Sequence, residues 1–206
     1  MRSGTLSRGQ SLKTVVNGIW KNHPIFSMIL GICSALAVSN TVANALAMGA
    51  GVTFVLLATG LLVAALRRLI PTRVRMITYM IIIATFVIVV DRTLNALFPD
   101  IRQAIGPYVG LIITNCIIMG RAEAFYIQNR VGQSLLDAFS NGFSYTYTLV
   151  SVAVVRELLG FGTILGFRVM PAGFTNWVVM AMAPGAFFVL AVFIWISRSL
   201  AGTEEE

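Results

Sequence analysis

Long apolar stretches separated by short charged connections dominate the hydrophobic pattern of this chain. No charged residue occurs from Pro24 to Leu66, and the polar run at residues 39–41 divides that stretch in two. Further uncharged stretches occupy residues 76–90, 104–120, 138–155 and 177–196. The hydrocarbon core of a bilayer takes about 20 helical residues. The pattern therefore predicts an all-α integral membrane protein with six transmembrane helices, of which the first and fourth are short.

Composition supports the membrane class and argues against a soluble or nucleic-acid-binding protein. Of the 206 residues, 57% are hydrophobic and only 11% are charged, and the mean hydropathy is +0.85. Soluble domains carry roughly 25% charged residues. The net charge of +7 comes from basic residues dispersed between the apolar stretches, without the aromatic-flanked basic stripe that nucleic-acid binding favours.

The distribution of basic residues predicts the orientation in the membrane. The most basic segments are residues 1–23 and the connection at 67–75, which carries four arginines and no acidic residue. Basic loops face the cytoplasm, so we expect both termini to be cytoplasmic. Arg2, Arg8 and Lys13 precede no apolar core of the signal-peptide kind, so we expect the first span to remain in the mature protein.

A sparse internal repeat divides the chain. Pro24 precedes Cys33 by the same nine positions that separate Pro107 from Cys116. Residues 64–70 also resemble 153–159 when a small insertion is allowed. Three spans per repeat force the second copy to enter the membrane from the opposite side, so the repeats are predicted to be inverted. The expected organisation is a cytoplasmic segment at 1–23, repeats at 24–98 and 99–200, and an acidic tail at 201–206.

The sequence has only two cysteines, Cys33 and Cys116, at equivalent positions of the two short spans. Their spacing matches no zinc, CxxC or haem motif. Three interpretations stay open: small buried side chains, an intramembrane disulfide, or metal ligation completed by another chain. Neighbouring Ser34, Thr114 and Asn115 are candidates for hydrogen bonding near the sulfur atoms, or for ordinary contacts between helices. No motif of a self-contained enzyme is present.

Charged and polar residues at the predicted span ends have simpler interpretations. Arg121 and Glu123 either lie inside the protein or end the fourth span at the lipid headgroups. Arg156 and Glu157 are expected to mark the membrane interface. Asn44 is expected to help cap the second span.

Four segments resemble a known family. They are LGICSALAV at 30–38, TNCIIMGRAEAF within 111–125, RELLG at 156–160 and APGAFF at 183–188. They are similar to the NqrDE/RnfAE family, whose members are integral membrane subunits of the sodium-pumping NADH:quinone oxidoreductase and of the Rnf ferredoxin:NAD oxidoreductase. The resemblance extends over essentially the whole chain, and the 114–125 run is highly specific. Residues 19–22 and 44–46 favour the RnfE branch, with NqrD as the alternative.

The resemblance implies a role in a redox-driven, ion-translocating oxidoreductase of the bacterial cytoplasmic (inner) membrane. Cys33 and Cys116 would supply two of four ligands of an intramembrane [2Fe-2S] cluster, and a homologous subunit, RnfA or NqrE, the other two. Flavins and further iron–sulfur clusters would belong to other subunits. Electron relay across the bilayer would be coupled to transport of Na⁺ or H⁺. Rival interpretations are a small non-redox secondary transporter and an assembly subunit.

Overall fold

The computed structural model describes residues 30–97, 99–164, 167–168 and 178–202. The predicted cytoplasmic segment, the first half of the first predicted span and the end of the acidic tail lie outside this part. The elements are α2 (Ile32–Val38), α3 (Val42–Leu66), η1 (Thr72–Val74), α4 (Arg75–Leu97), α5 (Pro99–Ile113), α6 (Cys116–Arg121), the π-helical turn η2 (Ala122–Tyr126), α7 (Val131–Phe161), β1 (Thr163–Ile164), β2 (Phe167–Arg168), α8 (Val178–Ala181) and α9 (Ala183–Gly202).

The predicted helical class is confirmed, and three membrane-length apolar helices are found in the described part. They are Val42–Leu66, Arg75–Leu97 and the broken stretch Gly106–Tyr126. A shorter apolar helix occupies Pro184–Ile196. Helix α7 is the longest described helix, at 31 residues, but it contains Asp137, Arg156 and Glu157. The other predicted spans therefore remain a prediction.

Several helix ends differ from those predicted, because local backbone chemistry sets them rather than the first charged residue. Helix α4 continues through Asp91 and Arg92, where the third span was expected to close. Helix α3 is capped by Thr41, whose hydroxyl accepts from the Asn44 N–H at 3.4 Å, so Asn44 is not the capping side chain. Helix α7 ends at Gly162, whose φ of 67° is the left-handed conformation that glycine adopts at helix C-termini.

A two-residue antiparallel ribbon follows α7, in a chain for which only helices were predicted. Thr163 pairs with Arg168, and Ile164 pairs with Phe167. Strands of two residues are too short to show the alternation of apolar and polar residues that is typical of strands, so the hydrophobic pattern could not predict them.

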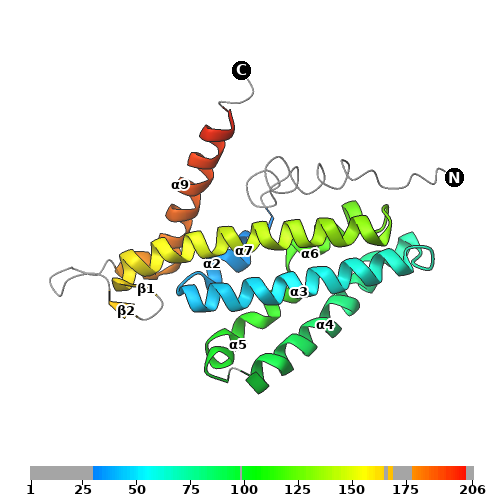
Figure 1. The fold of residues 1–206 in the computed structure, drawn as a ribbon, viewed down its shortest axis with the longest axis horizontal. Coiled ribbons are helices and arrows are strands. Elements are labelled where there is room, and N and C mark those ends of the chain that lie inside the picture. The colour runs from blue at the N-terminus through cyan, green and yellow to red at the C-terminus, as the bar shows by residue number, and fades with distance from the viewer. Residues whose placement is uncertain (1–29, 98, 165–166, 169–177, 203–206) are drawn as a thin grey trace.

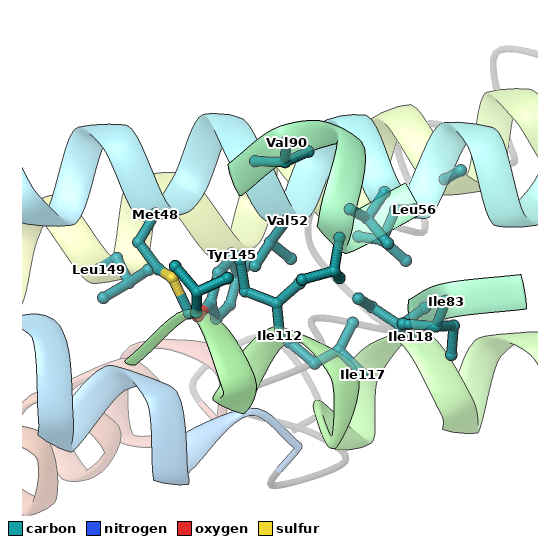
Figure 2. Packing of buried hydrophobic residues seen from close by; sticks show 14 of the residues in the cluster. Met48, Val52, Leu56, Ile83, Val90, Ile112, Ile117, Ile118, Tyr145 and Leu149 are labelled. Atoms are coloured by element: carbon teal, nitrogen blue, oxygen red, sulfur yellow. The ribbon is translucent and has the colours of Figure 1, made fainter. Parts of the chain in front are cut away.

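Helices α3 and α7 form the centre of the molecule and lie side by side in opposite directions (Figure 1). Helices α4 and α5 pack together beside α3, and α9 projects away from this group (Figure 1). Figure 2 shows the core between these elements. It contains Met48, Val52 and Leu56 from α3, Tyr145 and Leu149 from α7, and Ile112, Ile117 and Ile118 from α5 and α6.

Two glycines let α3 and α7 approach closely, and their packing is reciprocal. A Cβ atom on Gly49 would stand 2.6 Å from Thr146 Cγ2, and one on Gly142 would stand 2.7 Å from Thr53 Cγ2. Each threonine hydroxyl donates to the carbonyl of the glycine four residues earlier on its own helix, at 2.7 and 2.8 Å. Small residues at close helix crossings are typical of membrane proteins. Two inverted repeats would produce this local two-fold packing, although the repeat boundaries stay a prediction.

We predict that Gly142→Ala destabilises the protein, because the new methyl group overlaps the Thr53 side chain. Overpacking of this kind costs about 1–3 kcal/mol. The measurement is thermal unfolding of the detergent-solubilised complex that contains the chain. Gly132→Ala is the matched control on the same helix, because no atom lies within 4 Å of a Cβ built there. Equal unfolding temperatures for the two variants would contradict the close crossing.

Candidate functional site

Both cysteines lie in the first turn of a short helix, at a break in the chain. Helix α5 ends at Ile113 and α6 begins at Cys116, so the fourth span is not the continuous helix that was predicted. Cys33 is the second residue of α2, which follows Gly31 in the left-handed conformation, at φ 82°. Two residue types explain these breaks, since glycine adopts positive φ without strain and asparagine favours helix caps.

Asn115 explains the break between α5 and α6. Its backbone is extended, and its side-chain Oδ1 accepts from the Ile117 N–H at 3.0 Å, which satisfies one free donor of the new helix. Inside a continuous helix the same side chain would compete with the backbone hydrogen bonds. The polar pair at 114–115 in an apolar stretch was therefore an available signal for a break.

The structure brings Cys33 and Cys116 together, although they are 83 positions apart in the sequence. Their side chains are close enough to interact with one another. The Gly31 N–H donates to Cys116 Sγ at 2.8 Å, so the start of α2 contacts the sulfur of α6 directly. Cys33 is exposed on the surface of the chain, and Cys116 is half-buried. Their role as metal ligands stays a prediction.

The three residues singled out beside the cysteines separate into two groups. Ser34 and Asn115 are fully buried and bonded to each other, with Asn115 Nδ2 donating to Ser34 Oγ at 3.3 Å. Thr114 instead faces the surface. Ser34 Oγ also contacts the hydroxyl of Tyr145 at 2.7 Å. Sequence analysis missed Tyr145, because one tyrosine in a Ser/Thr/Tyr-rich helix gives no signal of which neighbour it will face.

Arg121 lies inside the protein, which decides between the two interpretations of that residue. Its guanidinium forms a bidentate ion pair with the Asp137 carboxylate, and both side chains are buried. The guanidinium also stands 5.2 Å from the centre of the Phe125 ring. Glu123 is half-buried and pairs with Arg75 at 2.7 Å. A buried charge requires such a partner, because its desolvation is otherwise uncompensated.

Arg156 and Glu157 are buried within the protein, at 2% and 3% exposure. Their predicted place at the membrane interface stays a prediction. Glu157 accepts from the Val42 N–H at 2.7 Å, in the first turn of α3. A carboxylate there complements the partial positive charge of the helix N-terminus. The pair therefore binds backbone groups at helix ends. Hydrophobic periodicity and charge counting could not predict this role.

Arg156 holds the C-terminal ends of two short helices. It donates to the Ser39 hydroxyl at 2.6 Å and to the Leu36 carbonyl at 3.4 Å, at the end of α2. It also donates to the carbonyls of Met180 and Met182, both at 3.2 Å, at the end of α8. Carbonyls at helix C-termini lack partners within their own helix, and the Met182 carbonyl also accepts from the Gly185 N–H at 3.2 Å. Arg156 thereby fixes the far end of the helix that carries Cys33.

We predict that Arg156→Ala lowers the stability of the solubilised complex by about 2–4 kcal/mol, because the buried Ser39 hydroxyl and the carbonyls at two helix ends lose their donor. Arg156→Lys should be intermediate, since an ammonium keeps the charge but lacks the planar fork that reaches two helix ends. Thermal unfolding checks both. Arg130→Ala is the control, because that arginine is exposed at the start of α7. A variant at 156 as stable as this control would refute the assigned role.

Comparison with known proteins places the chain in a family. The profile of the Rnf-Nqr subunit family, described as a membrane protein, matches residues 11–194. The chain belongs to this family. The resemblance found in the sequence is thereby confirmed over most of its length.

Individual relatives refine the branch within the Rnf-Nqr family. Proteins named as NqrD, one of the subunits of the Na(+)-translocating NADH-quinone reductase, are similar over nearly the full length. The Chlamydia pneumoniae protein is 45% identical over 188 residues, which cover 86% of this chain and 88% of the relative. The Chlamydia abortus protein is 46% identical over 197 residues, 91% and 92% of the two chains. The Chlamydia felis protein is 44% identical over 192 residues, 88% and 90%. These names favour the NqrD alternative over the RnfE branch.

Proposed function

We propose that this chain is the NqrD component of a sodium-translocating NADH–quinone reductase and holds half of a [2Fe-2S] cluster through Cys33 and Cys116. Two observations support the proposal. Relatives that carry the NqrD name are about 45% identical over most of the chain. The only two cysteines of the sequence lie close together, each in the first turn of a short helix.

The donor chemistry of the site fits such a cluster. Iron–sulfur clusters are held by cysteine thiolates and are tuned by hydrogen bonds to sulfur. Cys33 and Cys116 provide two such ligands, and the Gly31 N–H is already directed at one of the sulfur atoms. A [2Fe-2S] cluster bound there supplies a site that accepts and releases one electron at a time.

The exposure of Cys33 supports a site shared between chains. A four-cysteine site needs two further thiolates, and this sequence contains no other cysteine. Because Cys33 is exposed on the chain surface, a second protein chain can approach it directly. The homologous protein NqrE is the proposed partner, oriented so that its own pair of cysteines faces this one.

Buried hydrogen bonds give the site a rigid base on the side of this chain. Asn115 fixes the start of α6, Ser34 ties the start of α2 to Asn115, and Arg156 holds the other end of α2. Rigid support of metal ligands lowers the reorganisation that accompanies a change of charge. Redox coupling to sodium transport then requires a moving element apart from this rigid base.

We predict that Cys33→Ser and Cys116→Ser each remove one [2Fe-2S] signal from the EPR spectrum of the reduced whole complex. Serine keeps the size of the side chain but is a poor ligand for iron compared with a thiolate. Ser151→Ala, on the exposed face of α7, is the control. Iron content, measured on the same samples, should fall together with the signal.

Complex assembly must be shown for each variant by subunit stoichiometry after purification. An unchanged spectrum and unchanged iron content in both assembled cysteine variants would overturn the proposal. The secondary-transporter or assembly-subunit interpretation would then replace it, since neither requires the thiols.

A further inference from the structure

Tyr145 reaches the cysteine site from a helix that carries neither cysteine. It lies near the middle of α7, and its side chain is fully buried. Its hydroxyl is 2.7 Å from Ser34 Oγ, in the first turn of α2. It is also close enough to interact electrostatically with Cys33 and Cys116. Figure 2 shows Tyr145 among the core residues of α3, α5 and α6, at the centre of the packing.

The direction of the Tyr145–Ser34 hydrogen bond follows from the other bonds of Ser34. The serine hydroxyl has one proton, and it donates that proton to the Gly31 carbonyl at 3.1 Å, because a carbonyl can only accept. The tyrosine hydroxyl is therefore the donor to Ser34 Oγ. Asn115 Nδ2 is the second donor to the same oxygen, at 3.3 Å. All hydrogen-bonding capacity of Ser34 is used.

This arrangement connects Tyr145 to a cysteine sulfur through two residues, Ser34 and Gly31. Ser34 holds the Gly31 carbonyl, and the Gly31 N–H donates to Cys116 Sγ at 2.8 Å. Gly31 is also held sterically, since a Cβ there would stand 3.3 Å from Tyr145 Cε2 and 2.5 Å from Ile117 Cδ1. The tyrosine thus acts on both sides of Gly31, with its hydroxyl through Ser34 and with its ring by direct contact.

We propose that Tyr145 is a positioning residue that fixes Gly31, and through it the N–H···S hydrogen bond and the relative placement of Cys33 and Cys116. The proposal rests on the function proposed above. A purely structural role would be satisfied by the ring alone, so a phenylalanine would replace the tyrosine without consequence. The two roles therefore differ in what they predict for the hydroxyl.

The decisive substitution is Tyr145→Phe in the whole complex, which removes the hydroxyl and keeps the ring. The [2Fe-2S] signal should persist in amount, while its midpoint potential moves to a more negative value. The reason is that a weakened N–H···S bond stabilises the reduced, more negative cluster less. Tyr147→Phe is the matched control, because that tyrosine lies two residues further along α7 and is 59% exposed.

A second readout needs no cluster. In complex stripped of iron by a chelator under reducing conditions, mild oxidation should join Cys33 and Cys116 by a disulfide: each thiol loses one proton and the added oxidant, such as a disulfide reagent, takes up the two electrons. Tyr145→Phe should slow this reaction by about threefold or more, which corresponds to about 0.7 kcal/mol in the placement of the two thiols. Mass spectrometry of the cysteine peptides measures the rate.

Ser34→Ala keeps the test decisive if Tyr145→Phe prevents assembly, because it removes the hydroxyl through which the tyrosine acts. Where both variants assemble, the double variant should show the same shift as Ser34→Ala alone, since the two groups act in series. Potentials and disulfide rates that match those of Tyr147→Phe in both Tyr145→Phe and Ser34→Ala would overturn the proposal. Its failure is separate from that of the proposed function, which is decided by the signal in the cysteine variants.

Discussion

A helix broken inside a bilayer leaves backbone N–H and C=O groups where water cannot satisfy them, and this constraint shapes the described structure. Each unsatisfied group in hydrocarbon costs several kcal/mol. In the described residues, α2 starts after Gly31 in the left-handed conformation, and the helical path is interrupted between α5 and α6 and between α8 and α9. Cys116 Sγ accepts from the Gly31 N–H before α2, Asn115 caps α6 with its own side chain, and Arg156 donates to the carbonyls at the end of α8. Ser34, Asn115 and Arg156 are buried polar residues that act at these positions.

The same side chains connect parts of the sequence that are far apart. Asn115 satisfies α6 and reaches Ser34 in α2, and Tyr145 of α7 reaches the same serine. Arg156 and Glu157, also on α7, bind the end of α2 and the start of α3. Helix α7 is therefore the common support of the breaks. The cysteine site is a consequence of this arrangement, because a helix break also leaves a backbone N–H free to face a sulfur atom.

The sequence predicted the helical membrane class and the family, because these depend on composition, periodicity and specific motifs. The ligand role of the two cysteines stays a prediction. Charge counting located the starts of α3 and α4 to within a few residues, but it missed the ends of α4 and α7 by six or seven residues. It failed where a charged residue is buried by a partner, as with Arg121 and Asp137, or lies inside a continuing helix, as with Asp91. No local sequence pattern indicates which distant residue a charged side chain will pair with.

Helix breaks, and the residues that stabilise them, could also be predicted only in part from the sequence. Asn115 carries a readable signal, since a capping residue in an apolar stretch favours a new helix start. Tyr145 and Arg156 carry none, because their roles depend on the tertiary packing of α7 against α2. The branch assignment failed for a different reason. The segments that favoured RnfE are short, whereas the similarity to NqrD proteins is spread over most of the chain.

The most direct test of the account is a cryo-EM map of the whole complex at a resolution that separates metal from sulfur. The account predicts strong density in contact with the sulfur atoms of Cys33 and Cys116, completed by two cysteines of a homologous protein. The Gly31 N–H should face Cys116 Sγ in the same map. Two cysteines lying apart from each other, or side by side with only protein or lipid density between them, would contradict it.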